Sequence, residues 1–528
     1  MRQFFRSTDA IILAGLLLLV TLLRLPNFFE PYWYGDEAIY LTIGNALNYG
    51  EILYQDIVDH KTPGIYWLAQ VGTQLNFRIV LMGWMLASTT LFFLISKQVC
   101  SNRWSIGWAS LFFVIFTSIP FFEGNIPNGE LFVIGFVLLG TWLLLQSTVG
   151  QAIKMQKTST THTKDFVFLL GSGAAFGLAI LVKIPALFDW LGAISLLYFI
   201  VLRYASTQGW KSYTKLWQSV RHYLLLTSAQ TLAVLLVLAA SIGYFWLIGA
   251  GSDYLEFGLL YNFHYAGNWE VTHLDPKLAW WFSLPGKATF LAVTGVILSF
   301  ISFQKLSVVG RWLGMWVALA LIAALLSNRP YPHYFLQIIP PLALLLGHTI
   351  EEWSVKRKNR KSSSLSLTTA LTGILITFSV LTIWLINAFP YPTISYYATW
   401  YRFMTNQITP TEYRDSFNYL LADNYRFNQA DLVQPGENLF IWGTNPMLYA
   451  QTQTIPVGRF TVAFHIHDLG LYSETMQAVE RVKPKIIITQ HAEDTELPGL
   501  NQLLEAEYVA DETYDHFTLW QLRDSIAE

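Results

Sequence analysis

The chain has 528 residues, of which 53% are hydrophobic and only 13% are charged, and its formal net charge is −2. Soluble domains carry about 25% charged residues, so this composition excludes an ordinary soluble protein. With 20 Trp, 27 Tyr and 36 Phe, it indicates a multi-pass membrane protein with aromatic interfaces. The one cysteine, Cys100, excludes an intramolecular disulfide bond and a metal site built from several cysteines.

The chain begins with a short basic stretch and an apolar run over residues 11–23, a pattern that resembles a signal peptide. No small-residue cleavage pattern precedes the acidic stretch that follows, and many more apolar segments come later. We therefore interpret this run as a retained first transmembrane helix.

A helix needs about 20 mostly apolar residues to cross a bilayer. Eleven segments meet or approach this requirement: 9–25, 78–97, 104–122, 130–147, 166–182, 186–202, 223–250, 280–303, 311–327, 335–350 and 366–388. An odd number of spans would place the two termini on opposite sides of the membrane. Lys183 and Pro185 leave almost no loop between segments 166–182 and 186–202, which therefore form either a tight helical hairpin or a broken re-entrant pair.

Lysine and arginine are distributed unevenly between the two sets of loops, and this asymmetry predicts the orientation. One set contains Arg2, Arg6, Lys97, Arg103, Lys154, Lys157, Lys164, Arg203, Lys211, Lys215, Arg221, Lys305, Arg311, Lys356, Arg357, Lys358, Arg360 and Lys361. The other set contains only Lys61, Lys183, Lys277, Lys287 and Arg329, with Arg24 and Arg78 at the ends of spans. The N-terminus is therefore expected in the cytoplasm and the residues from about 389 outside it. The basic run 356–361 is explained by this topology and requires no nucleic-acid partner.

The first external loop, residues 26–77, carries two adjacent carboxylates, Asp36 and Glu37, directly after the first span. Acidic groups near lipid are costly and are retained mainly for function. Residues 38–47 have helical spacing and a short apolar run begins at residue 65, so short helices at the membrane surface are expected. Between them lie Asp59, His60 and Lys61, which form either a solvated polar turn or part of a site.

Other loops on the same side add charged groups. Glu130 opens the next span, where its carboxylate either complements the helix dipole or serves a site. Arg329, His333 and Tyr334 follow the ninth span, where an arginine can bind phosphate through a bidentate fork or act as an interface anchor. The stretch 251–279 contains histidines and acids without metal-ligand spacing, and we expect it to be a solvated loop.

From residue 389 the composition changes to that of a soluble domain. Residues 437–444, 484–490 and 514–520 are predicted strands and 474–482 a helix, while residues 400–436 are expected to form linking helices. His465 and His467 could bind a metal, but exposed surface histidines are more common. The predicted fold class is an all-α polytopic membrane domain over residues 1–388 and a small extracytoplasmic α/β domain over residues 389–528.

The external polar groups combine acids with cations: Asp36, Glu37, His60, Lys61, Glu130, Arg329, His333 and Tyr334. Transfer of a group from a lipid-linked phosphate to an acceptor hydroxyl or amine needs both kinds. A carboxylate accepts the acceptor's proton as attack begins, and cations stabilise the charge that develops on the departing phosphate.

The order and common sidedness of these groups resemble the GT-C glycosyltransferases, in particular the bacterial relatives of protein O-mannosyltransferases and of lipid A aminoarabinose transferases. The resemblance rests on Asp36-Glu37, Asp59-His60-Lys61-Thr62-Pro63, Glu130 and Arg329-Pro330-Tyr331-Pro332-His333-Tyr334. It covers about residues 1–350, and the C-terminal part has no assigned counterpart. Thr62 departs from the pattern, because relatives often carry two prolines after that lysine.

The resemblance implies that a sugar is transferred, with inversion, from a polyprenyl phosphate to a glycolipid such as lipid A, an envelope glycan or a protein, outside the cytoplasm at a bacterial inner membrane. It implies Asp36 as the catalytic acid of the first loop, Glu37 as its neighbour near the acceptor and Glu130 as the second-loop acid. Lys61, Arg329, His333 and Tyr334 would line the donor-phosphate site. The resemblance implies either metal-independent or metal-assisted transfer. A divalent metal held by His60 and His333 is an alternative to hydrogen bonding of these histidines to phosphate.

Two other classes of function stay open. A multi-pass transporter or lipid flippase would use the acids to relay protons or bind cations, but transporters place ionisable groups near the midplane and contain internal repeats. Here the acids cluster at one face. A non-catalytic assembly protein that presents the C-terminal domain would tolerate simultaneous substitution of Asp36, Lys61 and Arg329.

Overall fold

The computed structural model describes residues 7–150, 163–207, 213–267, 269–301, 305–358 and 366–523. Of the basic residues used to predict the orientation, seven lie outside this described part: Arg2, Arg6, Lys154, Lys157, Lys211, Arg360 and Lys361. The chain divides into two compact units. The first contains residues 1–25, 81–241 and 263–393, and the second contains residues 26–80, 242–262 and 394–528. The last division lies close to the predicted domain limit at 388/389, whereas the first loop falls in the second unit.

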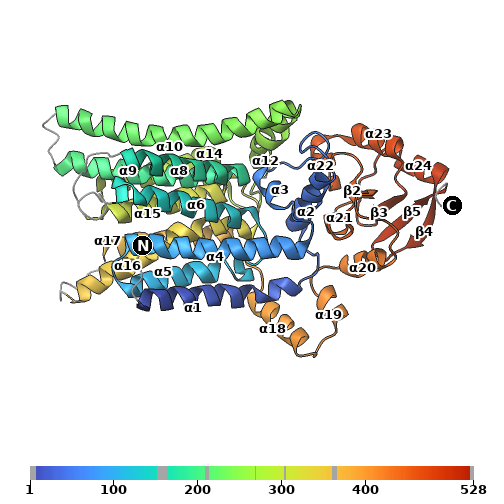
Figure 1. The fold of residues 1–528 in the computed structure, drawn as a ribbon, viewed down its shortest axis with the longest axis horizontal. Coiled ribbons are helices and arrows are strands. Elements are labelled where there is room, and N and C mark those ends of the chain that lie inside the picture. Colours follow the sequence, from blue (N-terminus) through green and yellow to red (C-terminus); the bar gives the residue numbers. More distant parts are fainter. Residues whose placement is uncertain are drawn as a thin grey trace. The chain divides into compact units, whose positions relative to one another are not determined.

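The first unit is a bundle of long apolar helices (Figure 1). Its helices are α1 (Ser7–Arg24), α4 (Gln74–Val99), α5 (Arg103–Phe116), α6 (Gly129–Gln146), α8 (Thr163–Val182), α9 (Leu187–Thr207), α10 (Tyr213–Leu247), α13 (Pro276–Ala279), α14 (Leu284–Val296), α15 (Val308–Ala324), α16 (Ile339–Lys358) and α17 (Leu367–Leu385). Short turns connect them: η2 (Pro120–Phe122), η3 (Ile184–Ala186), η5 (Trp280–Phe282), η6 (Ile297–Ile301) and η7 (Pro332–Ile338). The divisions between the two units fall within α4, within α10 and within three shorter elements, η1 (Leu25–Phe29), α12 (Tyr261–Gly267) and α18 (Thr393–Met404).

Eight helices of the described chain are long and apolar enough to cross a membrane, and a ninth span results if the pair Pro276–Phe282 and Leu284–Phe300, bent by 70°, counts as one. Two shorter apolar helices, α5 and α15, account for the remaining predicted segments. Each of the eleven predicted segments therefore coincides with an apolar helix, and the predicted multi-pass helical architecture is confirmed.

Of the two possibilities for segments 166–182 and 186–202, the structure contains the helical hairpin. The segments are two separate helices, α8 and α9, and each is long enough to span a membrane. Lys183 and the 3-10 turn η3 join them, and the chain runs back along the bundle in α9 (Figure 1).

Small residues allow close helix packing inside this unit, as is usual in membranes. A Cβ at Gly140 would lie 2.8 Å from the Phe176 ring, and the Ser172 hydroxyl donates to the Gly140 carbonyl at 2.7 Å, so α6 and α8 approach closely. Likewise, a Cβ at Gly192 of α9 would lie 2.5 Å from the Trp316 indole of α15.

The second unit joins the first loop to the C-terminal residues. Its helical elements are η1 (Leu25–Phe29), α2 (Gly35–Asn48), α3 (Gly64–Leu68), α11 (Gly251–Asp253), the π-helical η4 (Tyr254–Leu260), α18 (Thr393–Met404), α19 (Pro410–Asp415) and α20 (Leu421–Gln429). Only the first two residues of α12 (Tyr261–Gly267) belong to this unit, and the rest belong to the first unit. The expected short helices of the first loop are α2 and α3, and the expected linking helices are α18 to α20. A capping box between Thr409 and Glu412 fixes the start of α19.

The C-terminal residues contain a five-stranded mixed sheet in the order β2-β1-β3-β5-β4 (Figure 1). Its strands are β1 (Asn438–Trp442), β2 (Ile455–Pro456), β3 (Ile486–Gln490), β4 (Tyr508–Thr513) and β5 (Phe517–Leu522), and the associated helices are α21 (Pro446–Thr452), α22 (Ala463–Leu469), α23 (Tyr472–Val482) and α24 (Leu500–Glu507). β1 pairs in parallel with β2 and β3, whereas β5 pairs antiparallel with β3 and β4. The predicted α/β domain is confirmed, although β2 and β4 were not predicted.

The central strands β1 and β3 are almost continuously apolar because both faces of the sheet are covered. The core of this part consists of Phe427, Val433, Leu439, Ile441, Leu448, Tyr449, Ile486, Ile488, Tyr514, Phe517 and Leu519. Burial of each such side chain contributes about 1.5–3 kcal/mol to folding.

Candidate functional site

Asp36 lies in the first turn of α2, beside a lysine of the same loop. Its Oδ2 atom accepts a hydrogen bond from the Tyr40 hydroxyl at 3.0 Å and lies 3.8 Å from Lys61 Nζ. The Asp36 side chain remains 30% exposed, whereas the Lys61 side chain is 10% exposed. The pair therefore combines an accessible carboxylate with a sheltered cation.

Asp59 holds Lys61 from the other side. Its Oδ2 atom lies 3.3 Å from Lys61 Nζ and accepts a hydrogen bond from the Tyr66 hydroxyl at 2.7 Å. Burial raises the pKa of Asp59, but Lys61, His60 and His465 outweigh burial and hold this pKa well below its usual range. Asp59 is therefore an ionised group inside the site.

Glu37 points to a different set of partners. Arg78 donates to both of its carboxylate oxygens, from Nε at 2.8 Å and from Nη2 at 2.7 Å, and the Gln74 amide donates at 3.1 Å. Arg78 Nη2 also lies 3.4 Å from Glu30. Because Glu37 is only 1% exposed, this bidentate ion pair fixes α2 to the start of α4.

In the first unit, a buried arginine shapes the loop between α5 and α6. Arg24 is 1% exposed and donates to the Thr117 carbonyl at 2.6 Å and to the Gly124 carbonyl. The neighbouring Glu123 has a left-handed backbone, with φ of 55°, and its Oε2 atom lies 2.5 Å from His333 Nδ1. The loop thereby presents one carboxylate to the turn η7.

Glu130 forms an ion pair with Lys183, which comes from the junction of α8 and α9. Lys183 Nζ also lies 4.3 Å from the centre of the Tyr334 ring, a cation–π distance. Glu130 is 4% exposed. The start of α6, the turn η7 and the residue that follows α8 therefore meet.

Arg329 is stacked on aromatic rings of the first unit. Its guanidinium lies 4.0 Å from the centre of the Tyr265 ring and 5.2 Å from that of Trp269, and the Tyr265 and Tyr334 hydroxyls lie 3.4 Å apart. Stacking orients a guanidinium while its edge can still bind an anion.

The predicted site residues thus form one group in each unit. Asp36, Lys61 and His60 belong to the group in the second unit, with Glu37 held apart on Arg78; Glu130, His333, Tyr334 and Arg329 belong to the first unit. Sequence reasoning gave Arg78, Glu123 and Lys183 no place in a site, and it gave Asp59 no role of its own. Asp59 is part of the motif that contains Lys61, and this proximity was the available signal.

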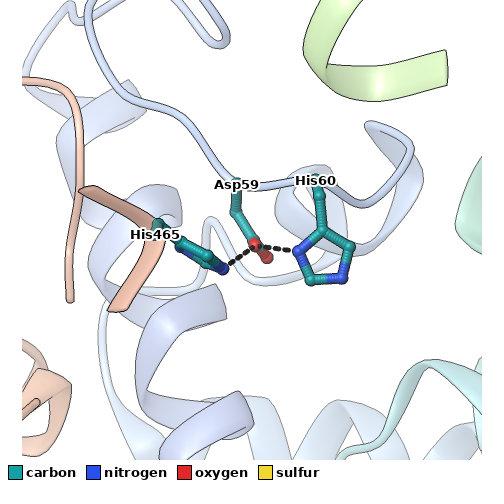
Figure 2. A group of neighbouring side chains, drawn as sticks. All are labelled: Asp59, His60 and His465. Carbon is teal, nitrogen blue, oxygen red and sulfur yellow. Dashed lines mark ion pairs between the residues drawn. The ribbon is translucent and has the colours of Figure 1, made fainter. Parts of the chain in front are cut away.

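His465 is not a surface histidine. It is 3% exposed, and burial lowers its pKa to about 3. Its Nε2 atom lies 3.5 Å from Asp59 Oδ1, which also lies 2.8 Å from His60 Nδ1. Figure 2 shows both rings turned toward the Asp59 carboxylate. Burial likewise lowers the pKa of His60. The sequence-based expectation of an exposed His465 is therefore wrong, because the chain folds this helix against the first loop within the second unit.

Comparison with known proteins adds two findings. No model of a known protein family matches the chain. Among curated proteins, an undecaprenyl phosphate-α-4-amino-4-deoxy-L-arabinose arabinosyl transferase from Pseudomonas fluorescens (strain Pf0-1) is 24% identical over 365 residues. This match covers 65% of the chain and 59% of that protein.

The fold is similar to that of two solved structures of ArnT. The crystal structure of ArnT from Cupriavidus metallidurans bound to undecaprenyl phosphate superposes with a TM-score of 0.53 and 12% identity, covering 98% of each chain. ArnT in the apo state gives a TM-score of 0.50 and 13% identity over 97% of each chain. Because the aligned region includes the C-terminal residues, the likeness extends beyond the expected limit near residue 350. The chain therefore has the GT-C type of fold found in ArnT, and its resemblance to the lipid A aminoarabinose transferases is confirmed.

Proposed function

We propose that this protein transfers a sugar from a polyprenyl-phosphate donor to an acceptor on the extracytoplasmic side of a bacterial inner membrane. The observation that carries the proposal is the accessible Asp36 carboxylate beside the sheltered Lys61 ammonium, 3.8 Å away, on a chain with the fold of ArnT. The curated relative is named as an arabinosyl transferase that uses undecaprenyl phosphate, which supports the same class of donor.

Asp36 is the general base in this proposal. Its Oδ1 or Oδ2 atom accepts the proton of the acceptor hydroxyl or amine while the acceptor atom attacks the anomeric carbon. The bond between that carbon and the phosphate oxygen breaks on the opposite face, and the phosphate leaves with both electrons. Attack and departure on opposite faces invert the anomeric centre.

Lys61 compensates the charge that develops on the leaving phosphate. Its ammonium is already oriented by Asp59 and stacked 5.1 Å from the centre of the Tyr40 ring, so little reorganisation is needed when the phosphate arrives. Arg329, His333 and Tyr334 of the first unit are also assigned to phosphate binding, and this assignment rests on the resemblance to the GT-C glycosyltransferases. Arg329 supplies guanidinium donors. Nδ1 of His333 is already paired with Glu123.

The two remaining acids take different roles. Both Glu37 oxygens are bound by Arg78, so we assign Glu37 as a positioning residue that fixes α2 and with it Asp36. Glu130 is assigned as the second catalytic carboxylate, with Lys183 controlling its orientation.

The distribution of lysine and arginine supports an extracytoplasmic site, because the proposed catalytic and phosphate-binding residues lie in the loops that contain few lysines and arginines. The transporter alternative gains no comparable support. Asp189, the buried acid of α9, already accepts hydrogen bonds from Trp316 at 2.7 Å and Gln337 at 2.5 Å, which suits a packing role.

The test compares cell-envelope glycolipids and glycoproteins by mass spectrometry in cells that make the native protein, Asp36→Asn or no protein. We expect one modification to require the native chain and to disappear in Asp36→Asn at equal amounts of membrane-inserted protein. Glu256→Gln, an exposed carboxylate of the same unit, is the matched control and should behave as native. A modification that persists in Asp36→Asn would overturn the assignment of the base, and identical profiles in all strains would overturn the transferase itself.

A further inference from the structure

A buried cluster of one carboxylate and two imidazoles lies in the second unit, and it does not include the proposed base Asp36. Within the described part of the chain, Asp59, His60 and His465 are the group of three whose ligand atoms all lie within 4.8 Å of one another (Figure 2). The three side chains come from two segments that are more than four hundred residues apart in sequence.

Backbone contacts fix the two segments relative to each other. Val58 pairs with Phe460 in a short parallel bridge, and its N–H donates to the Arg459 carbonyl at 2.6 Å. Asp59 and His60 follow this bridge directly on one segment. His465 follows it on the other, in the first turn of α22.

The distances around Asp59 Oδ1 suit a shared metal ion. Nitrogen and oxygen ligands lie about 2.0–2.2 Å from zinc, so two ligands of a tetrahedral ion are about 3.3 Å apart. The observed separations from Asp59 Oδ1, 2.8 Å to His60 Nδ1 and 3.5 Å to His465 Nε2, lie on either side of that value. Small side-chain rotations would complete the arrangement.

The two carboxylate oxygens of Asp59 have different partners. Oδ2 is occupied by the Tyr66 hydroxyl and the Lys61 ammonium, an outer contact of the kind that orients metal-binding carboxylates. Oδ1 faces the imidazoles. Neither ring nitrogen of His465 has a hydrogen-bond partner among the described residues, although His465 is 3% exposed. Buried polar groups are nearly always satisfied. We therefore expect a bound group that accepts the lone pair of one ring nitrogen of His465.

We propose that Asp59, His60 and His465 bind a divalent transition-metal ion of the zinc type, which ties the first loop to the C-terminal α/β part. One carboxylate and two imidazoles are a ligand set used for zinc and for other first-row divalent ions. Three protein ligands leave a coordination position for water or another oxygen. The proposal does not depend on glycosyl transfer.

Zinc binding by the purified full-length protein in detergent tests the proposal directly, provided that the protein carries no polyhistidine tag. After treatment with a chelator and its removal, Zn²⁺ is titrated against a competing chromophoric chelator, and bound metal is counted by mass spectrometry. We expect one zinc per chain and a higher melting temperature with zinc than without it. Cobalt in place of zinc should give the visible absorption of a tetrahedral or five-coordinate ion.

His465→Gln, which keeps a buried polar side chain, should weaken zinc binding at least about tenfold, since even outer contacts of metal sites are worth that much. His467→Gln is the matched control, because His467 lies on the same helix but contacts Glu493 and Tyr472; it should bind zinc as the native protein does. Folded native protein that binds no zinc, or unchanged affinity in His465→Gln, would overturn the site. Glycan transfer measured on the same preparations distinguishes this outcome from failure of the transferase proposal.

Discussion

Arg78 and Glu37 form a bidentate ion pair that is almost completely shielded from solvent: the two hydrogen bonds measure 2.8 and 2.7 Å, and the side chains are 1% exposed. Arg78 also donates to the Asn27 carbonyl. One guanidinium thereby joins the turn η1, the helix α2 and the start of α4. Asp36 precedes Glu37 directly, so the ion pair determines where the proposed base lies.

Arg78→Ala should strongly destabilise the protein, because it leaves the buried Glu37 carboxylate without its cation. Breaking one side of a buried pair costs about 3–5 kcal/mol, and we expect a marked fall in the melting temperature in detergent. The double variant Arg78→Met with Glu37→Met should recover much of the loss. If Arg78→Ala has the same melting temperature as the native protein, the ion pair does not have this structural role.

Much of the fold could be predicted because it depends on local composition. All eleven apolar segments are helical, and β1 and β3 were evident as short apolar runs such as Ile486-Ile487-Ile488. The partners of the charged residues could not be predicted. Arg78 with Glu37, Lys183 with Glu130 and His465 with Asp59 are contacts between distant segments, and nothing in the local pattern of either partner specifies the other. β4 was missed because Tyr508–Thr513 contains two adjacent acids, which are depleted in strands, and it lies at the edge of the sheet.

Lys61→Met should reduce sugar transfer and the affinity for undecaprenyl phosphate, if Lys61 contacts the donor phosphate as proposed. A hydrogen bond to a charged group contributes about 1.5–3 kcal/mol, which corresponds to roughly a ten- to hundredfold loss. Native mass spectrometry of the detergent-solubilised protein with undecaprenyl phosphate measures the affinity. Lys277→Met removes an exposed lysine and is the control; equal affinity in both variants would contradict the role of Lys61.

The pair formed by Glu130 and Lys183 offers a way to separate catalysis from packing. If Glu130 is a catalytic carboxylate, Glu130→Gln should lose far more transfer activity than Lys183→Met, while the two variants lose similar stability. If Glu130 serves only to neutralise Lys183, the activities of the two variants should fall in parallel. Initial rates and melting temperatures of both variants, measured at equal protein concentration, decide between these outcomes.

Gly44 tests whether the close approach of α2 and α3 matters for the site. A Cβ at this position would lie 2.5 Å from the Ala69 carbonyl oxygen, so Gly44→Ala must push the two helices apart. Overpacking of this kind typically costs about 1–3 kcal/mol, and we expect a lower melting temperature together with reduced transfer. Gly15→Ala, where no atom lies within 4 Å of the added Cβ, should leave both quantities unchanged.

Arg329 is expected to act through the orientation of its guanidinium as well as through its charge. The Arg329 guanidinium lies 4.0 Å from the centre of the Tyr265 ring. A guanidinium that is already stacked loses less conformational entropy when it binds phosphate. Arg329→Lys keeps the charge but loses the planar fork, so donor affinity should fall between that of the native protein and that of Arg329→Gln. Tyr265→Leu should weaken donor binding in the native background but have little further effect in Arg329→Gln, because its contribution passes through the arginine. Additive losses in the double variant would show that Tyr265 acts on the donor by another route.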